Sequence, residues 1–343
     1  MAMPSSGTAV REVGEFPLIE ILGRLARNRA GGRVPLGIGD DAAVWRPRPG
    51  RQVVVTNDLL VEHVHFRLDW VDWETLGHKA LAVNLSDIAA MGASPAVAVV
   101  GLGLHGYEKD REIADLYRGM DRLGARFGVT IIGGDVSSSP AAIVISVTVL
   151  GETPRSGTLM TRAGARPGDV IGVTGPLGLA AAGLRVLERQ LLTIDGEPIM
   201  REAFNQPEPR VREGRLLRRL GVRAAMDLSD GLLGDLPKVC QASGVSAVID
   251  MLKLPVPHAI RWNFDDWFDM SLRGGEDYEL LFTAPPDIFA RVTRAFGRAG
   301  LRPPIEIGEI VEARPEGPSL QIRGASGRLR DLTPGAFSHF GSR

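Results

Sequence analysis

The chain has 343 residues, of which 44% are hydrophobic and 24% charged, and its 40 basic and 41 acidic side chains leave a formal net charge of -1 at pH 7. This length favours two domains over one, and the balanced charge excludes the broad basic surface of a nucleic-acid-binding protein. The single cysteine, Cys240, excludes an internal disulfide and a zinc site built from cysteines. The N-terminal residues do not form a secretory signal, and the longest apolar stretches are about half of the roughly 20 residues that span a bilayer, so we expect a cytoplasmic protein.

The first half of the chain alternates helical and extended patterns. Apolar periodicity and β-branched runs predict helices over 14–29, 73–91 and 110–127 and strands over 53–56, 96–102, 130–132 and 142–150. Gly92 is expected to end the second helix. The stretch 151–168 contains glycine and proline but few large apolar residues, which favours a domain boundary there. We therefore predict domains over 1–152 and 153–343.

The second half continues the alternation. Strands are predicted over 169–174, 224–226, 280–283, 304–311 and 319–323, and helices over 177–188, 232–243 and 287–300. The fold class expected for both domains is therefore α/β (or α+β).

Acidic residues recur in turns that contain glycine or serine and follow apolar strands, or on a helix face. There are six such places: Asp40-Asp41, Asn57-Asp58, Ser86-Asp87, Gly134-Asp135, Asp227 to Asp230, and Glu276-Asp277. Mg²⁺ is usually held by one or two carboxylates together with substrate phosphates, and glycine lets a phosphate approach the backbone closely. The pattern favours a metal-phosphate site.

Aspartate also caps helices and makes turns without binding any ligand. Asp230 precedes the predicted 232–243 helix and could serve as its N-cap, and Asp40 could be a turn residue. Asp87 is harder to explain in this way, because it falls late in a helix, where aspartate is unfavourable.

Other ligand motifs are weaker. The chain contains no P-loop sequence and no protein-kinase motif set. The segment 101–106 fits G-x-G-x-x-G after a strand, which leaves a dinucleotide site open, although glycines that relieve crowding at a strand end explain it better. His63 and His65 have a spacing that could bind zinc but lack a third ligand nearby.

Several blocks of the sequence together resemble the thiamine-monophosphate kinase family, within the superfamily of aminoimidazole-ribonucleotide synthetase. They are LGIGDDAAV (36–44), DLLVEHVHF (58–66), GHKALAVNLSDIAAMGASP (77–95), IIGGDVSSSP (131–140), TRAGARPGDVIGVTGPLGLAAAGL (161–184), MDLSDGLLGDL (226–236), GGEDYELLF (274–282) and FSHF (337–340). The resemblance covers nearly the whole chain.

The resemblance implies that the N-terminal domain binds ATP and Mg²⁺ and pairs in a homodimer, while the C-terminal domain closes over the substrate. It implies ATP-dependent phosphorylation of thiamine monophosphate to thiamine diphosphate by direct transfer, with several Mg²⁺ ions and no general base. The positions that match metal-binding residues are Asp41, Thr56, Asp58, Asp87, Asp135, Asp227 and Asp230, with Asp40 as a further candidate. Those that match ATP contacts are Gly134, Arg162 and Ser229, and those that match substrate contacts are His65, Glu276 and Phe337.

The chain departs from the family pattern in two places. His63 stands where the family usually has glycine, and Phe337 and Pro334 stand where many members have tryptophan or tyrosine. A synthetase acting on a phosphorylated nucleotide precursor is the nearest alternative activity. Selenophosphate synthesis would need a reactive cysteine near the N-terminus and hydrogenase maturation a C-terminal cysteine, and Cys240 is in neither position. A non-catalytic nucleotide-binding module is the alternative from a different functional class.

Overall fold

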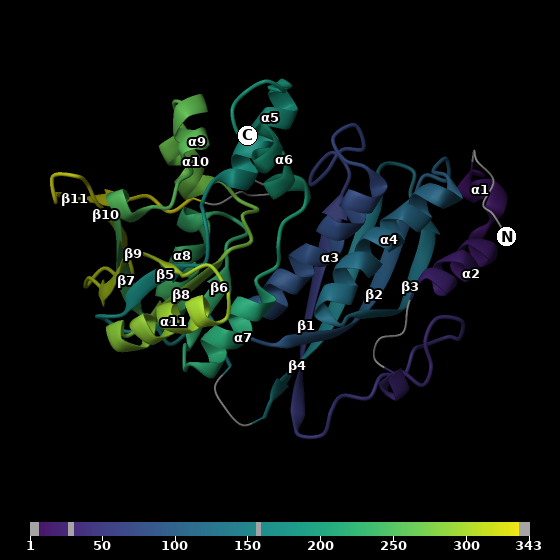
Figure 1. Cartoon of the computed structure of the whole chain (residues 1–343), viewed down its shortest axis with the longest axis horizontal. Helices are drawn as coiled ribbons and strands as arrows, with labels where there is room; N and C mark the ends of the chain where they lie inside the picture. The colour runs from purple at the N-terminus through teal and green to yellow at the C-terminus, as the bar shows by residue number, and fades with distance from the viewer. Residues whose placement is uncertain (1–6, 27–30, 156–158, 336–343) are drawn as a thin grey trace. The chain divides into compact units, whose positions relative to one another are not determined.

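The computed structural model of the chain describes residues 7–26, 31–155 and 159–335, which form two compact units (Figure 1). The N-terminal unit comprises Met1–Ile88 and Ala93–Ser156, and the C-terminal unit comprises Ala89–Gly92 and Gly157–Arg343. Both units combine a β-sheet with helices, so the expected mixed α/β architecture is confirmed. The separate functions expected for the two domains stay predictions.

The N-terminal unit is built on a four-stranded sheet in the order β1-β4-β2-β3. Its strands are β1 (Arg51–Val61), β2 (Ser94–Leu104), β3 (Thr130–Ser138) and β4 (Val144–Pro154). Strand β4 pairs antiparallel with both β1 and β2, whereas β2 and β3 are parallel. The parallel pair is joined by a helical crossover, as parallel neighbours require.

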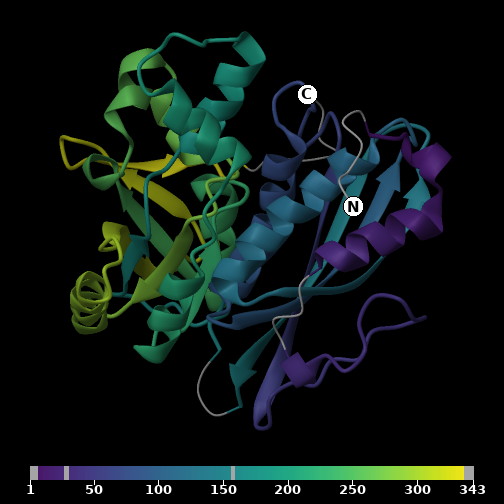
Figure 2. The same ribbon diagram turned by 45° about the vertical axis from the view of Figure 1, so that its right-hand side comes forward.

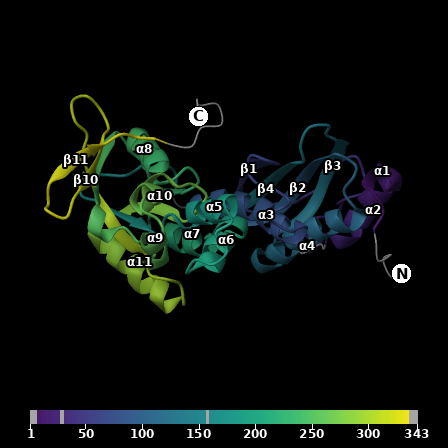
Figure 3. The ribbon, with the colours of Figure 1, turned by 90° about the horizontal axis from the view of Figure 1, so that it is seen from above.

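Helices α3 (Trp73–Ala90) and α4 (Asp110–Phe127) lie on one face of this sheet (Figure 3). The two helices approach so closely that only glycine fits at two contact positions. A Cβ added at Gly77 would lie 1.9 Å from the Leu116 carbonyl oxygen, and one added at Gly119 would lie 1.8 Å from the Glu74 carbonyl oxygen. Shorter elements precede the sheet: α1 (Val10–Val13), α2 (Glu15–Leu25) and the 3-10 turn η1 (Gly31–Arg33). Figure 2 shows α2 beside α4.

The opposite face of this sheet is only partly covered. Val34, Val97 and Ile132 form a small buried cluster there, with Trp45 packed against it. Side chains alternate between faces along a strand, and on this face of β1 Val53, Val55 and Leu59 are 42%, 61% and 49% exposed. The strand therefore presents an apolar surface to solvent within one chain.

The C-terminal unit contains a seven-stranded sheet in the order β11-β10-β7-β9-β5-β8-β6. The strands are β5 (Val170–Val173), β6 (Ala224–Asp227), β7 (Val245–Asp250), β8 (Leu280–Ala284), β9 (Ile305–Glu312), β10 (Leu320–Arg323) and β11 (Leu329–Leu332). Only the β7–β10 pair is parallel among these neighbours.

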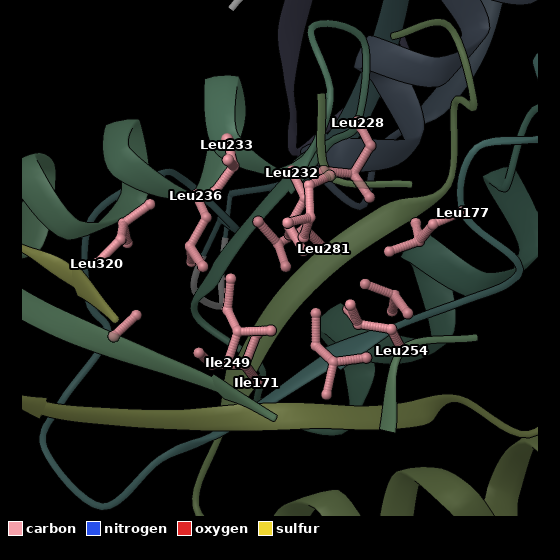
Figure 4. Packing of buried hydrophobic residues seen from close by; sticks show 14 of the residues in the cluster. Ile171, Leu177, Leu228, Leu232, Leu233, Leu236, Ile249, Leu254, Leu281 and Leu320 are labelled. Atoms are coloured by element: carbon pink, nitrogen blue, oxygen red, sulfur yellow. The ribbon is translucent and has the colours of Figure 1, made fainter. Parts of the chain in front are cut away.

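Helices cover both faces of the larger sheet. They are α5 (Leu179–Arg189), α6 (Glu197–Asn205), α7 (Val211–Arg219), α8 (Leu232–Ser243), α9 (His258–Asn263), α10 (Trp267–Arg273) and α11 (Pro286–Arg298), with the turn η2 (Met251–Lys253). Successive residues of β8 show the division, because Leu281 joins the main core with Leu232 and Leu236 of α8 (Figure 4), whereas Phe282 stacks on Phe289 of α11.

The G-x-G-x-x-G segment does not form a nucleotide-binding turn. Gly101 and Gly103 lie inside strand β2, where they pair with residues of β3 and β4, and only Gly106 falls in the turn before α4. A phosphate-binding loop requires these glycines between the strand and the helix. The dinucleotide interpretation is therefore rejected for this segment.

Candidate functional site

Three of the predicted metal-binding residues meet in the N-terminal unit. Thr56 and Asp58 lie on the face of β1 that looks toward helix α3, and Asp87 projects from that helix. The Thr56 hydroxyl donates a hydrogen bond to an Asp87 carboxylate oxygen. Thr56 and Asp87 are 31 residues apart in sequence, so the strand and the helix together form one cluster of polar side chains.

Asn84 supports this group, although the family resemblance assigned it no role in the sequence analysis. Its side chain is fully buried on α3; its Oδ1 accepts a hydrogen bond of 3.1 Å from the backbone N–H of Asp58, and its amide donates to the Ala80 carbonyl. A buried asparagine three residues before Asp87 on the same helix is the signal that could have identified it.

Burial, together with the nearby charge of Asp87, raises the pKa of Asp58 to about 6. Both causes disfavour the ionised carboxylate. A divalent cation would reverse this balance, because its charge stabilises both carboxylates. Two carboxylates and a hydroxyl are also the protein ligands that suit Mg²⁺ when phosphates and water complete its coordination.

The segment after β1 places His65 by backbone contacts. His65 Nδ1 accepts a hydrogen bond of 3.0 Å from the Val61 N–H, so the neutral ring carries its proton on Nε2. The ammonium of Lys79, which is 1% exposed, donates to the His65 carbonyl at 3.3 Å. His63, two residues earlier, has a φ of 65°, a left-handed conformation that favours glycine.

Asp40 and Asp41 lie in an exposed turn between η1 and β1. The Asp40 carboxylate accepts a hydrogen bond of 2.8 Å from the Asp41 N–H, and its role as a turn residue or as a ligand stays a prediction. Glu152, only 3% exposed on β4, fastens this segment by accepting from the Arg33 guanidinium and the Arg48 N–H, each at 2.8 Å.

Asp135 is not brought next to Asp58 within one chain. Asp58 pairs with Val147, Val147 with Val100, and Val100 with Gly134, so these residues form one row across the sheet. Strands are about 4.8 Å apart, which puts Gly134 roughly 14 Å from Asp58. Asp135 is the next residue, and its side chain therefore points to the opposite face of the sheet.

Gly134 has a structural reason to be glycine. A Cβ at this position would lie 2.0 Å from the Val100 carbonyl oxygen of the neighbouring strand. Any side chain would separate β3 from β2, so the residue is needed for strand pairing whether or not it also contacts a nucleotide.

In the C-terminal unit, two loops that carry predicted site residues are joined by their backbones. We call residues 227–231 the DLSDG loop and residues 274–279 the GGEDYE loop. The N–H of Glu276 donates to the Ser229 carbonyl at 2.8 Å, and the N–H of Tyr278 donates to the Leu228 carbonyl at 2.9 Å. A Cβ at Gly275 would lie 2.5 Å from the Ser229 oxygen, so glycine permits this close contact.

Asp227 and Asp230 differ in their surroundings. Asp227 is buried at the end of β6, whereas Asp230 is one-third exposed and accepts a hydrogen bond of 2.6 Å from the Lys238 ammonium. Lys238 also contacts fully buried Asp235 at 2.8 Å. Gly231 is the N-cap of α8, so the N-cap role considered for Asp230 is not observed.

The remaining predicted residues have less defined environments. Arg162 is exposed, next to Thr161, which forms a β-bridge with Ala224 at the start of β6. Glu276 is partly buried, and its φ of 65° is unusual for a residue with a side chain. Phe337 lies outside the described residues.

Some of the predicted residues thus come together: Thr56, Asp58 and Asp87 in the N-terminal unit, and the DLSDG and GGEDYE loops in the C-terminal unit, whereas Asp135 lies on the opposite sheet face from Asp58. Within the described ranges, no three His, Cys, Asp or Glu side chains converge as a ready-made metal site, and no helix is long and apolar enough to cross a membrane. The zinc site considered for His63 and His65 is therefore not formed by the described side chains. The Thr56–Asp58–Asp87 group is instead suited to a cation that also binds phosphate oxygens.

Comparisons with known proteins place both units in described families. The model of the AIR synthase related protein, N-terminal domain, matches residues 39–153, and that of the C-terminal domain matches residues 166–319. Thiamine-monophosphate kinase of Bacillus subtilis (strain 168) is 39% identical over 254 residues, which cover 73% of this chain and 78% of the relative.

Solved structures show the same relationship. Thiamine-monophosphate kinase from Stenotrophomonas maltophilia K279a has a TM-score of 0.79 at 37% identity, covering 90% of this chain and 96% of its own. The structure of AaThiL complexed with AMPPCP and TMP has a TM-score of 0.74 at 30% identity, covering 98% of this chain and all of its own.

Proposed function

The chain belongs to the thiamine-monophosphate kinase family, and we propose that it transfers the γ-phosphoryl group of ATP to thiamine monophosphate, giving thiamine diphosphate and ADP. The observation that carries this proposal is the similarity over nearly the whole chain to a protein solved with AMPPCP and TMP. The family models and the Thr56–Asp58–Asp87 group support it further.

In the proposed reaction a phosphate oxygen of thiamine monophosphate attacks the γ-phosphorus, and the bond from that phosphorus to the β-bridging oxygen breaks. The second pKa of a phosphate monoester is about 6, so the attacking oxygen is already ionised near pH 7. The chain then needs no general base, and positioning with charge neutralisation lowers the barrier.

We propose that this chain's carboxylates hold Mg²⁺. Thr56, Asp58 and Asp87 would form one binding group, and Asp41, Asp135, Asp227 and Asp230 stay predicted ligands by resemblance. Bound Mg²⁺ supplies charge that offsets the repulsion between the two phosphates. Without it, one pair of unit charges 4 Å apart costs about 4 kcal/mol at an effective dielectric of 20.

For the ligands themselves, Gly134, Arg162 and Ser229 are proposed to contact ATP, and His65, Glu276 and Phe337 to contact thiamine monophosphate. Cytoplasmic location is also part of this proposal. The direct test is ADP release from ATP and Mg²⁺ with thiamine monophosphate, thiamine or an aminoimidazole precursor as acceptor. The proposal predicts release with the monophosphate; release only with the aminoimidazole precursor would instead favour the synthetase alternative.

We also propose that the chain is a homodimer paired through the uncovered sheet face of the N-terminal unit. Val53, Val55 and Leu59 support this, because a monomer would leave these apolar side chains in water. Val55→Glu should yield a monomer in light scattering after size-exclusion chromatography, whereas Val64→Glu, at a position 54% exposed in the turn after β1, should not. A wild-type monomer, or a dimer that tolerates Val55→Glu, would contradict this interface.

A further inference from the structure

The GGEDYE loop contains three carboxylates, and two of them face the interior of the C-terminal unit. Asp277 accepts hydrogen bonds from the N–H groups of Gly178 and Ala180 at 2.6 and 3.1 Å, which ties the loop to the start of helix α5. Glu279 is 3% exposed. Only Glu276 was expected to contact substrate, so the other two carboxylates need another explanation.

Glu279 is held from two directions. Arg210 donates to both of its oxygens, from Nη2 at 2.6 Å and from Nε at 2.8 Å, and the Thr174 hydroxyl donates to Oε2 at 2.6 Å. The same hydroxyl accepts a hydrogen bond from the Leu280 N–H at 2.8 Å. The paired geometry fixes both the position and the orientation of the carboxylate.

The Glu279 carboxylate lies close against the backbone that follows β5. A Cβ at Gly175, two residues after β5, would lie 2.0 Å from Glu279 Oε1, so glycine is needed where the carboxylate lies against the backbone. Thr174 is itself 2% exposed. The Glu279 side chain is therefore an anchor built into the end of the sheet.

The backbone just before this anchor has an unfavourable conformation. Glu276 and Tyr278 have φ values of 65° and 48°, in the left-handed region that residues with side chains rarely adopt. Such a conformation persists only where surrounding contacts impose it. The N–H of Leu228 donates to the Glu279 carbonyl at 2.8 Å, so the anchor also sets the position of the DLSDG loop.

From these contacts we infer that Glu279, clamped by Arg210 and Thr174, is a positioning residue that holds Glu276 and Ser229 in the arrangement needed for substrate binding. The inference rests on the proposed function, because it takes these two residues to be ligand contacts. Glu279 acts through the loops and does not itself touch substrate.

The first test is Glu279→Gln, which keeps the shape of the side chain but replaces the charge that Arg210 requires. We expect the KM for thiamine monophosphate to rise about tenfold or more, with a smaller change in kcat. Asp169→Asn is the matched control, because Asp169 is also a buried carboxylate (6% exposed) that anchors the same sheet, through Arg166 N–H and Thr283. It should lower Tm without raising this KM.

A double variant separates positioning from stability. Arg210→Met alone should lower Tm because it leaves a buried carboxylate unpaired, and Arg210→Met with Glu279→Met should recover Tm. The inference predicts that KM stays raised in the double variant, since the clamp is still missing. Recovery of KM together with Tm would overturn it and leave Glu279 a purely structural residue.

Hydrogen exchange tests the same inference without any assay of activity. In Glu279→Gln the amides of Glu276 and Tyr278 should exchange faster than in the wild type, while those of strand β9 keep their rates. Unchanged exchange at both amides would contradict the inference. Wild-type protein that forms no thiamine diphosphate would instead refute the proposed function, and the exchange result would still decide whether the clamp exists.

Discussion

Asp58 of strand β1 and Asp87 of helix α3 lie close enough for the charge of one to raise the pKa of the other, and burial raises the pKa of Asp58 further, to about 6. Thr56 donates to Asp87, and Asn84 fixes the backbone of Asp58. These contacts hold two like charges together at a cost in stability. Such an arrangement is typical of a site that binds a cation.

Asp87→Asn should remove activity without unfolding the protein. The amide keeps the size of the side chain but loses the charge that a metal requires, and we expect kcat to fall on the order of 10²-fold or more. Tm should stay level or rise, because the repulsion with Asp58 is relieved. Steady-state kinetics and a thermal melt check both effects, and loss of folding would contradict the metal-ligand assignment.

The Mg²⁺ requirement should depend on pH through Asp58. With a pKa of about 6, this carboxyl is mostly ionised above pH 7 and mostly protonated below pH 5. Protonation removes a ligand charge, so the Mg²⁺ concentration for half-maximal activity should rise as pH falls through 6. A requirement that is constant between pH 5.5 and 7.5, measured at saturating substrates, would argue against Asp58 as a ligand.

Lys238→Met tests whether Asp230 is available to metal. The ammonium lies between Asp230 and fully buried Asp235, so its removal leaves two carboxylates without their counter-ion and should cost about 1–3 kcal/mol in EDTA. Mg²⁺ should then raise Tm more in the variant than in the wild type. Lys253→Met, which breaks an exposed pair with Glu306, should change neither value. An equal Mg²⁺ effect in Lys238→Met and the wild type would place the metal away from Asp230.

His63→Gly should stabilise the turn after β1. A left-handed conformation costs a residue with a side chain roughly 1–2 kcal/mol, and glycine removes this strain. Glycine also raises the conformational entropy of the unfolded chain, which offsets part of the gain in stability. We expect a gain of about 0.5–1 kcal/mol in the free energy of unfolding, measured by urea titration. A lower stability in the variant would show that the His63 side chain makes a contact worth more than the strain.

The sequence predicted the long, strongly patterned elements well. Helix 73–91 is observed as α3, helix 232–243 is observed as α8, and the strand predicted over 304–311 is β9. Strand β7 (Val245–Asp250) was missed because it follows α8 after Gly244 alone and carries a continuous buried run without alternation. Helices α9 and α10 are too short for apolar periodicity to reveal them.

The candidate site was only partly predictable for a related reason. Residue type and local context made Asp58 and Asp87 candidates, and the resemblance implied their role as metal ligands, but their meeting depends on the packing of α3 against β1. Local patterns also do not show that the Lys238 ammonium donates a hydrogen bond to Asp230, or that Asp135 points away from Asp58 across the sheet. Strand register, and the position of the Asp230 loop against the start of α8, arise from tertiary structure and leave no local pattern.

The most direct measurement is identification of the product formed from ATP, Mg²⁺ and thiamine monophosphate, with the label followed from the γ-position of ATP. The account predicts thiamine diphosphate that carries the label in its terminal phosphate, in an amount equal to the ADP released. ADP released with labelled inorganic phosphate and no thiamine diphosphate would contradict the proposed phosphoryl transfer.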